Sequence, residues 1–428
     1  MSTQSNSVVQ IHSGAAVSRK KRALTLAGGG PAVGIGVGAL RALADFPEIT
    51  FDVWSLSCVG AWLGCLYHVS PDRTKKLDYV ENLLRGFFRE DKVYDKFPCP
   101  TVFLPDLPEM ISASMRFMID PQSYTNLVVP SEIVKGYQDI LDFYLRPSRW
   151  NYGDLCSVML NSVFAANPVS RFLMSMMYKS EMPGLNKLWY GPDYTLLKGF
   201  DMSLLEADDV PVLYHNAFNV DRQQLQLFSN KNDNYPKITT QTLCACSGLP
   251  YILSPVEING TTYVEGATVD TVGFWHLLKD HPDLDEVWVC RILDSHQIRP
   301  HHNLVEALNN LVMLFASTTS EDDVKLFKFH LKDLNEQRAA EAAKSNTQPH
   351  LIELVEFPVD YHTSYEWTHT NLRDSTAASY VAARQTIQDY LAKDYLAKSQ
   401  REEAASGAPP VSSFNTATVG TAASGVPG

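Results

Sequence analysis

The apolar positions of the N-terminal part form short runs, each followed by a helical pattern. Residues 23–27 form an apolar run that ends in three glycines at 28–30, and a helical pattern follows through 38–43. A second apolar run at 51–56 leads into a turn of small residues at 57–60, after which another helix begins. Alternation of strand, turn and helix is typical of a parallel α/β sheet.

The remaining pattern divides the chain into a helical block and a second group of strands. Residues 74–205 read as mostly helical with proline breaks, and the part beyond 292 is largely helical to about 399. Strands are expected at 210–220, 223–229, 256–258, 262–264, 285–292 and 351–358. The first two form a hairpin, and the next two flank an Asn-Gly turn at 259–260.

These elements predict one three-layer α/β/α domain over residues 22–399, with a mainly parallel central sheet. The block at about 74–205 is expected to be a large helical insertion or lid. Residues 1–21 and 400–428 are rich in small and polar residues and cannot bury enough apolar surface to fold. We therefore expect both ends to be disordered.

Composition narrows the class of protein. The chain has 428 residues, of which 45% are hydrophobic and 20% charged, as in ordinary globular proteins. A net charge of −12 argues against a general nucleic-acid binder. Seven cysteines without a CxxC pair suggest neither a disulfide framework nor a zinc site, and free thiols fit a reducing compartment. Without a secretory signal or an unbroken apolar 20-mer, we expect a soluble cytoplasmic protein, with peripheral membrane contact and homo-oligomerisation left open.

The glycines Gly28, Gly29 and Gly30 directly follow the first strand. Consecutive glycines let backbone N–H groups converge on one point, which suits a phosphate or a developing oxyanion. The spacing does not fit the dinucleotide fingerprint. A simple tight turn is the other interpretation of this loop.

The turn after the second strand has the character of a nucleophile elbow, which needs small residues on both sides of the nucleophile. Gly60 supplies the second small residue if Cys58 is the nucleophile, although Leu56 departs from the pattern. The competing frame, with Ser57 as nucleophile, puts Val59 at the tight position, so we favour Cys58. A buried structural cysteine is the alternative.

Far downstream, Glu265 is followed by Gly266 and Ala267, just after a hairpin strand. This arrangement projects a carboxylate from a loop, either into a site or into solvent. Together the glycine loop, the elbow and this acid resemble the patatin-like acyl hydrolases. That family has a glycine-rich oxyanion loop, a G-x-S-x-G elbow and a downstream Asp-Gly-Gly/Ala motif, and its Ser/Asp dyad works without a histidine.

The resemblance covers roughly residues 23–66 and 210–292, including a similar small-residue segment at 244–256. It implies that Cys58 and Glu265 stand where the family has its serine and aspartate, that Gly28, Gly29 and Gly30 form the oxyanion hole, and that Gly60 and Gly266 support the turns. Departures occur at both dyad positions, at Leu56, at Ala32, where the family has a basic residue, and at Val33, where it has a glycine.

Cys58 and Glu265 are chemically competent replacements. A helix N-terminus lowers the pKa of a thiol, so Cys58 is expected to be partly thiolate, whereas a neighbouring carboxylate raises that pKa. The resemblance thus implies an acyl hydrolase or acyltransferase, acting through a Cys acyl-enzyme on a hydrophobic ester or thioester (a lipid, acyl-CoA or acyl carrier). It implies no metal or organic cofactor. The alternative is an inactive lipid-binding or scaffold protein.

The helical block carries eight of the eleven methionines, between Met110 and Met182. Methionine packs irregular apolar volumes, so the block suits an acyl tunnel, a lid, a membrane contact or a plain helical core. The sequence leaves these four roles open.

Overall fold

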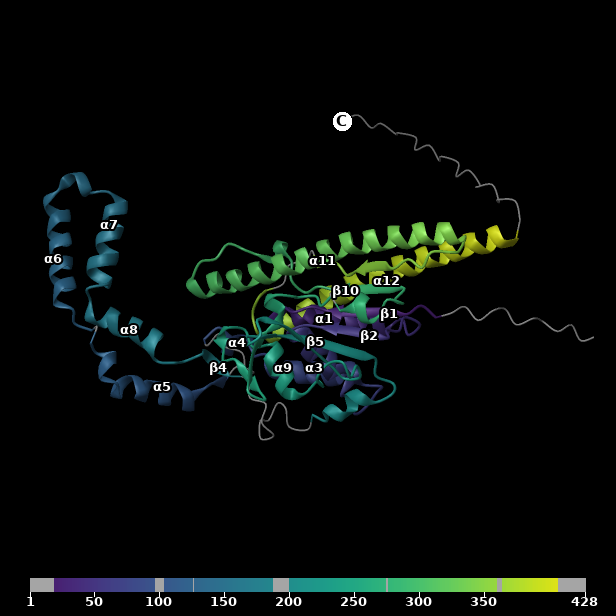
Figure 1. The fold of residues 1–428 in the computed structure, drawn as a ribbon, viewed down its shortest axis with the longest axis horizontal. Helices are drawn as coiled ribbons and strands as arrows, with labels where there is room; N and C mark the ends of the chain where they lie inside the picture. Colours follow the sequence, from purple (N-terminus) through teal and green to yellow (C-terminus); the bar gives the residue numbers. More distant parts are fainter. Residues whose placement is uncertain are drawn as a thin grey trace, which may run out of the picture.

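The computed structural model describes residues 19–96, 104–125, 127–187, 200–274, 276–359 and 364–406. An eight-stranded sheet lies at its centre, with strand order β11-β10-β1-β2-β5-β9-β8 and β6 added beside β5 (Figure 1). The parallel strands are β1 (Arg22–Leu26), β2 (Val53–Leu56), β5 (Val212–Asn219), β10 (Glu286–Cys290) and β11 (Glu353–Glu356). The strands β6 (Gln224–Ser229) and β9 (Thr261–Glu265) run antiparallel to β5, and β8 (Val256–Ile258) antiparallel to β9.

The alternation of side chains along β1 explains why the sheet is covered on both faces. Leu24 and Leu26 belong to one hydrophobic cluster, together with residues of the helices α1, α2 and α12. Ala23 belongs to a second cluster, which contains Val324 and Phe327 of α11. Every residue of β1, β2 and β10 is buried, as expected for central parallel strands. The prediction of a mainly parallel, three-layer α/β/α sheet is confirmed.

The helices that cover the sheet come from both sides of the helical block in the sequence. They are α1 (Gly34–Ala44), α2 (Val59–His68), α3 (Lys76–Phe87), α9 (Thr240–Cys246), α10 (Leu277–Asp280), α11 (Leu304–Ser345) and α12 (His369–Ser406). Glycines on α1 let α12 pack close against it, since a Cβ at Gly38 would lie 2.4 Å from the carbonyl oxygen of Thr376. The C-terminal third carries no motif that could be assigned from the sequence, yet its helix α12 completes the fold.

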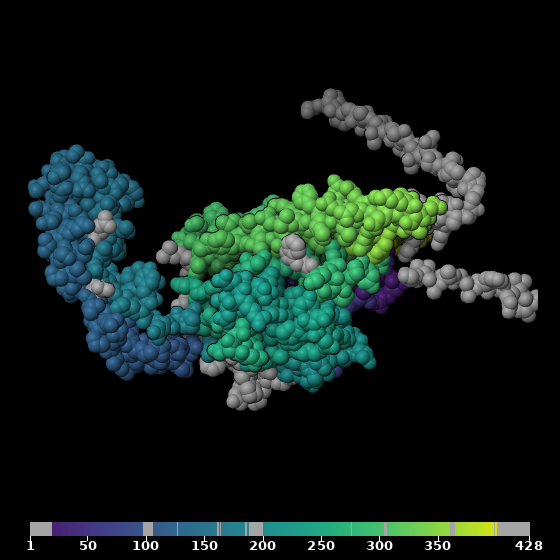
Figure 2. Space-filling view, viewed as in Figure 1, coloured from purple at the N-terminus to yellow at the C-terminus, as the bar shows by residue number. Residues whose placement is uncertain are grey.

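The helical block forms an arm that stands apart from the sheet (Figures 1 and 2). It contains α5 (Leu107–Ile119), α6 (Pro130–Leu145), α7 (Tyr152–Val158) and α8 (Pro168–Lys179), and the short α4 (Asp91–Tyr94) precedes it. A small sheet of β3 (Leu104–Pro105), β4 (Gly184–Lys187) and β7 (Tyr251–Leu253) joins it to the body. Prolines stand at the starts of α5, α6 and α8, where a missing N–H costs nothing. The small sheet was not foreseen, because its strands are too short to show a pattern.

The described chain ends differ from the expectation of disorder. Lys20 binds the buried carboxylate of Glu286 at 2.6 Å and Asp394 at 2.9 Å, so it holds the segment before β1 against the core. The helix α12 continues to Ser406, past the expected start of the tail at 400. The expected disorder of 1–18 and 407–428 lies outside the described residues. Of the helices in the described ranges, none combines the length and the apolar character that a membrane span needs.

Candidate active site

Cys58 lies in the sharp turn between β2 and α2, directly before the first residue of α2. Its backbone has φ 49° and ψ −123°, a conformation that is strained for a residue with a side chain. The turn is tight because α2 passes close to β1: a Cβ at Gly60 would lie 2.2 Å from the carbonyl oxygen of Leu26. Only glycine fits there. This requirement for a small residue at position 60 is the reason for favouring Cys58 over Ser57 as the nucleophile.

Ser57, the competing candidate, points away from the cavity that Cys58 lines. Its side chain is fully buried, and its hydroxyl donates to Asn216 Oδ1 at 3.1 Å and to the carbonyl oxygen of Asp270 at 3.3 Å. Asn216 in turn donates to the same carbonyl oxygen of Asp270 at 2.8 Å. Ser57 thus ties the elbow to β5, and Cys58 is the side chain presented to the cavity.

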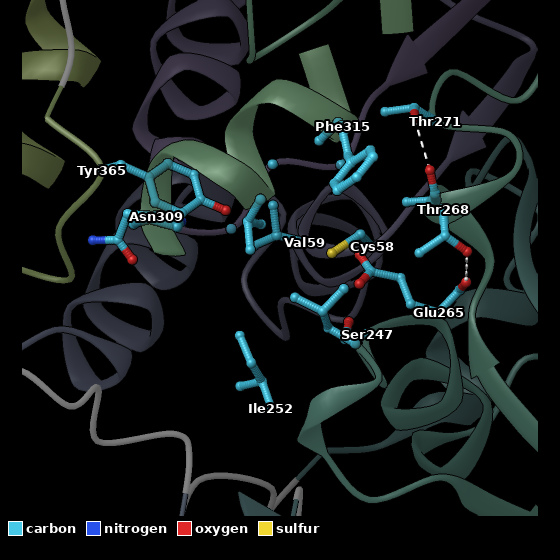
Figure 3. A pocket seen from close by; sticks show the side chains of 18 of the residues that line it. Cys58, Val59, Ser247, Ile252, Glu265, Thr268, Thr271, Asn309, Phe315 and Tyr365 are labelled. Carbon is cyan, nitrogen blue, oxygen red and sulfur yellow. Dashed lines mark hydrogen bonds between the residues drawn. The ribbon is translucent and has the colours of Figure 1, made fainter. Parts of the chain in front are cut away.

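The cavity has a volume of about 380 Å³, within the range of roughly 300–1,000 Å³ typical of ligand pockets. Its wall is mainly apolar, and Figure 3 shows Cys58 and Glu265 at its centre. The apolar side chains come from α2, α3, the segment around β7, α11 and the segment before α12; they include Trp62, Phe87, Leu249, Ile252, Val312, Phe315 and Trp367. Such a wall suits the hydrocarbon part of a ligand.

Glu265 is the last residue of β9, and the pairing of β9 with β5 carries it to the elbow. The residue is 7% exposed, and Figure 3 shows its carboxylate beside the Sγ of Cys58. The turn after it is close-packed, because a Cβ at Gly266 would lie 2.5 Å from Asn216 Oδ1. The hydroxyl of Thr268 donates to the carbonyl oxygen of Glu265 at 2.8 Å and closes this turn (Figure 3). The two residues expected from the sequence therefore meet.

Burial controls the protonation of this pair. It raises the pKa of Glu265 to about 7, although the neighbouring thiol of Cys58 acts in the opposite direction. Burial also raises the pKa of the Cys58 thiol well above its usual value; Glu265 adds to that shift, and the N–H of Val59 opposes it. The expectation of a partly ionised thiol is wrong, since desolvation outweighs the helix N-terminus. The pair is instead a neutral thiol beside a carboxylate that is half ionised near neutral pH.

The glycine loop follows β1 and lines the cavity beside Cys58. A Cβ at Gly28 would lie only 2.7 Å from the Cβ of Cys58. The N–H of Gly28 already donates to the carbonyl oxygen of Thr271, at 3.4 Å. Within the described ranges, the N–H groups of Gly29 and Gly30 have no backbone acceptor. Of the three expected donors, Gly29 and Gly30 are thus the free ones.

Several residues of the site carried no sequence motif. Asn216 braces the elbow from β5, the α11 residues Asn309, Val312 and Phe315 line the cavity, and Tyr365 lies before α12. The hydrophobic pattern predicts that α11 and α12 are helices. It cannot predict which of their residues line a cavity whose other walls come from distant parts of the sequence. No histidine is among the described residues of the cavity wall, and no group of three metal-ligating side chains occurs in the described parts of the chain.

Comparison with known proteins gives one family. A family model described as patatin-like phospholipase matches residues 24–278. No curated protein matches the chain. Among solved structures, VipD from Legionella pneumophila is 13% identical, with a TM-score of 0.34, over 87% of this chain and 67% of that one.

Proposed function

The chain belongs to the patatin-like phospholipase family, and from this premise we propose that it cleaves hydrophobic acyl esters through a covalent intermediate on Cys58. The family itself indicates lipid acyl hydrolase activity. The observation that supports the finer proposal is the placement of the Cys58 thiol, at a strained elbow, beside the buried carboxylate of Glu265 on the wall of an apolar cavity. Together these provide a nucleophile, its base and a place for the acyl chain.

In the proposed first step, the Sγ of Cys58 attacks the carbonyl carbon while the carboxylate of Glu265 takes the thiol proton. The carbonyl oxygen becomes an oxyanion, to which the free N–H groups of Gly29 and Gly30 donate. When the intermediate collapses, the bond to the leaving group breaks, and Glu265 returns the proton to that group. The product of this step is a thioester on Cys58.

In the second step, Glu265 takes a proton from the acceptor as the acceptor attacks the thioester carbonyl; the C–S bond then breaks, and Glu265 returns the proton to the Sγ of Cys58. Water as acceptor gives hydrolysis, and an alcohol, amine or thiol gives acyl transfer. Since exchange between thioesters is nearly balanced in energy, acyl-CoA or an acyl carrier is a further donor class in our proposal. An apolar wall that limits water near Cys58 favours transfer over hydrolysis.

The experiment is acyl release from a phospholipid in mixed micelles and from a medium-chain acyl thioester. Wild-type protein is compared with Cys58→Ala, with Glu265→Gln and with Ser57→Ala as the matched control. We expect release by wild type and by the serine variant, and loss in the other two. Release that survives Cys58→Ala refutes the proposed nucleophile.

A catalytically inactive lipid-binding protein is the second candidate. It is favoured by the burial that keeps the Cys58 thiol protonated, since a neutral thiol is a poor nucleophile until its base acts. Binding of a fatty acid with neither acyl release nor a covalent adduct would support this candidate over the first.

The arm supports a proposal about where the protein works. On α6, Tyr137, Leu141, Tyr144 and Leu145 form one stripe at helical spacing, and each is more than 60% exposed. Exposed apolar patches of this kind mark contact surfaces. We therefore propose that the arm contacts a lipid surface and that the protein is cytoplasmic and peripheral to a membrane. The helical block at residues 74–205 would then contain a membrane-contact arm. The alternative proposal is that the apolar stripe on α6 forms the interface between two arms in a homo-oligomer.

A further inference from the structure

Tyr365 brings a hydroxyl group to the glycine loop from the opposite end of the chain. The residue lies between β11 and α12 and lines the cavity. Its Oη is above Gly30, since a Cβ at Gly30 would lie 3.0 Å from Oη and 3.6 Å from Cζ. In Figure 3 the ring points into the cavity toward Cys58, from the side opposite Glu265. The hydroxyl thus lies beside Gly30, whose N–H has no backbone acceptor within the described ranges.

This hydroxyl has the properties of a hydrogen-bond donor to a ligand. Among the hydrogen bonds between described residues, none engages Tyr365 Oη. Burial raises the pKa of Tyr365, and the electrostatic effect of Cys58, Glu265 and Tyr94 raises that pKa further. The phenol therefore stays neutral and keeps its proton over the working pH range. A neutral phenol can donate but does not compete with Glu265 for the proton of Cys58.

The oxyanion loop itself is short of donors. The N–H of Gly28 is engaged with the carbonyl oxygen of Thr271, and Ala32 is a buried apolar residue with nothing to donate. Two backbone N–H groups, those of Gly29 and Gly30, are left. A third donor is worth most in a water-poor cavity, where an unpaired oxyanion is costly.

We propose that Tyr365 is a catalytic residue whose Oη donates a hydrogen bond to the substrate carbonyl oxygen as it becomes an oxyanion. This role rests on the proposed function. As the bond between Sγ and carbon forms, the electron pair of the C=O π bond moves to the oxygen, and the thiol proton goes to Glu265. Tyr365 keeps its own proton throughout and releases the oxygen when the carbonyl re-forms.

The test is single-turnover acylation of Cys58 by p-nitrophenyl octanoate, with the mass of the intact protein and p-nitrophenol release as readouts. Tyr365→Phe keeps the ring in the cavity wall and removes only the hydroxyl. Loss of one oxyanion donor typically lowers the rate by about 10²–10³-fold, so we expect a fall of about 10²-fold in the acylation rate constant. The KM and the melting temperature should stay close to those of wild type. Tyr380→Phe, which removes a surface hydroxyl bound to Asp45, directly after α1, is the matched control and should keep the wild-type rate.

The outcomes separate this role from a packing role and from the proposed function. An unchanged acylation rate in Tyr365→Phe overturns the role of Tyr365 and leaves Cys58 as nucleophile. A rise in KM at constant kcat also overturns it, because it describes a wall residue that only binds the acyl chain. If wild type itself forms no adduct, the proposed function fails and the role of Tyr365 fails with it.

Discussion

Replacing Glu265 with glutamine should stabilise the protein in alkaline solution while it removes the proposed base. The carboxyl is buried, and its pKa is raised from 4.5 to about 7, so the folded state resists its ionisation. Below pH 4.5 the group is protonated in both the folded and unfolded states and has no effect on stability. As pH rises from about 4.5 to about 7, the unfolded chain gains from ionisation and the folded chain does not, so stability is lost; above pH 7 the folded carboxyl ionises too and the loss levels off.

The magnitude follows from the linkage between proton binding and folding. At pH 8 the raised pKa of Glu265 costs the folded state about 3 kcal/mol, and at pH 5 only about 1 kcal/mol. Glutamine carries no charge at either pH. The free energy of unfolding of Glu265→Gln, relative to wild type, should therefore rise by about 2 kcal/mol between pH 5 and pH 8.

Urea unfolding of both proteins at pH 5, 6, 7 and 8 measures this difference. Burial also raises the pKa of Asp323 to about 7, but that group is present in both proteins and cancels. Glu257→Gln, which removes an exposed carboxyl on β8, is the matched control. A Glu265→Gln difference that is equal at pH 5 and pH 8 would refute the reasoning about the buried carboxyl.

Other substitutions test the remaining parts of the site and the arm. Ser57→Ala leaves Asn216 Oδ1 without its donor, so we expect a loss of about 1–3 kcal/mol in urea unfolding with acylation of Cys58 retained; loss of acylation at unchanged stability would contradict this. Gly60→Ala forces a Cβ against the carbonyl oxygen of Leu26 and should destabilise the fold by about 1–3 kcal/mol or more, with a wild-type melting temperature as the contrary result. Changing Tyr137, Leu141 and Tyr144 to serine should weaken sedimentation with phosphatidylcholine vesicles without changing the hydrolysis of a soluble ester; unchanged sedimentation would count against the lipid-contact arm.

The sheet and the elbow could be predicted because local physical requirements determine them. Buried strands leave uninterrupted apolar runs, and a turn that passes within 2.2 Å of a neighbouring carbonyl oxygen needs the glycine found at position 60. The Asn-Gly turn at 259–260 likewise marked the β8–β9 hairpin, which places Glu265. These signals lie within short stretches of sequence.

What could not be predicted depends on contacts between distant parts of the chain. The thiol of Cys58 stays protonated because residues from many parts of the chain bury it. The sequence indicated only the helix N-terminus beside Cys58, which would lower the pKa of the thiol. The position of Tyr365 over Gly30 joins residues more than three hundred positions apart, and no spacing rule reports it. The sequence left the helical block open between an acyl tunnel, a lid, a membrane contact and a helical core, and among the described residues none that lines the cavity comes from α5–α8.

The central claim is that Cys58 carries the acyl group, and peptide mapping of a trapped adduct tests it most directly. Wild-type protein is mixed with p-nitrophenyl octanoate and with an octanoyl thioester, quenched in acid, digested and analysed by mass spectrometry. The account predicts one octanoyl group on the peptide that contains Cys58, absent from Cys58→Ala and slowed in Glu265→Gln. An adduct on Ser57, or an adduct of equal yield in the Cys58→Ala protein, would contradict it.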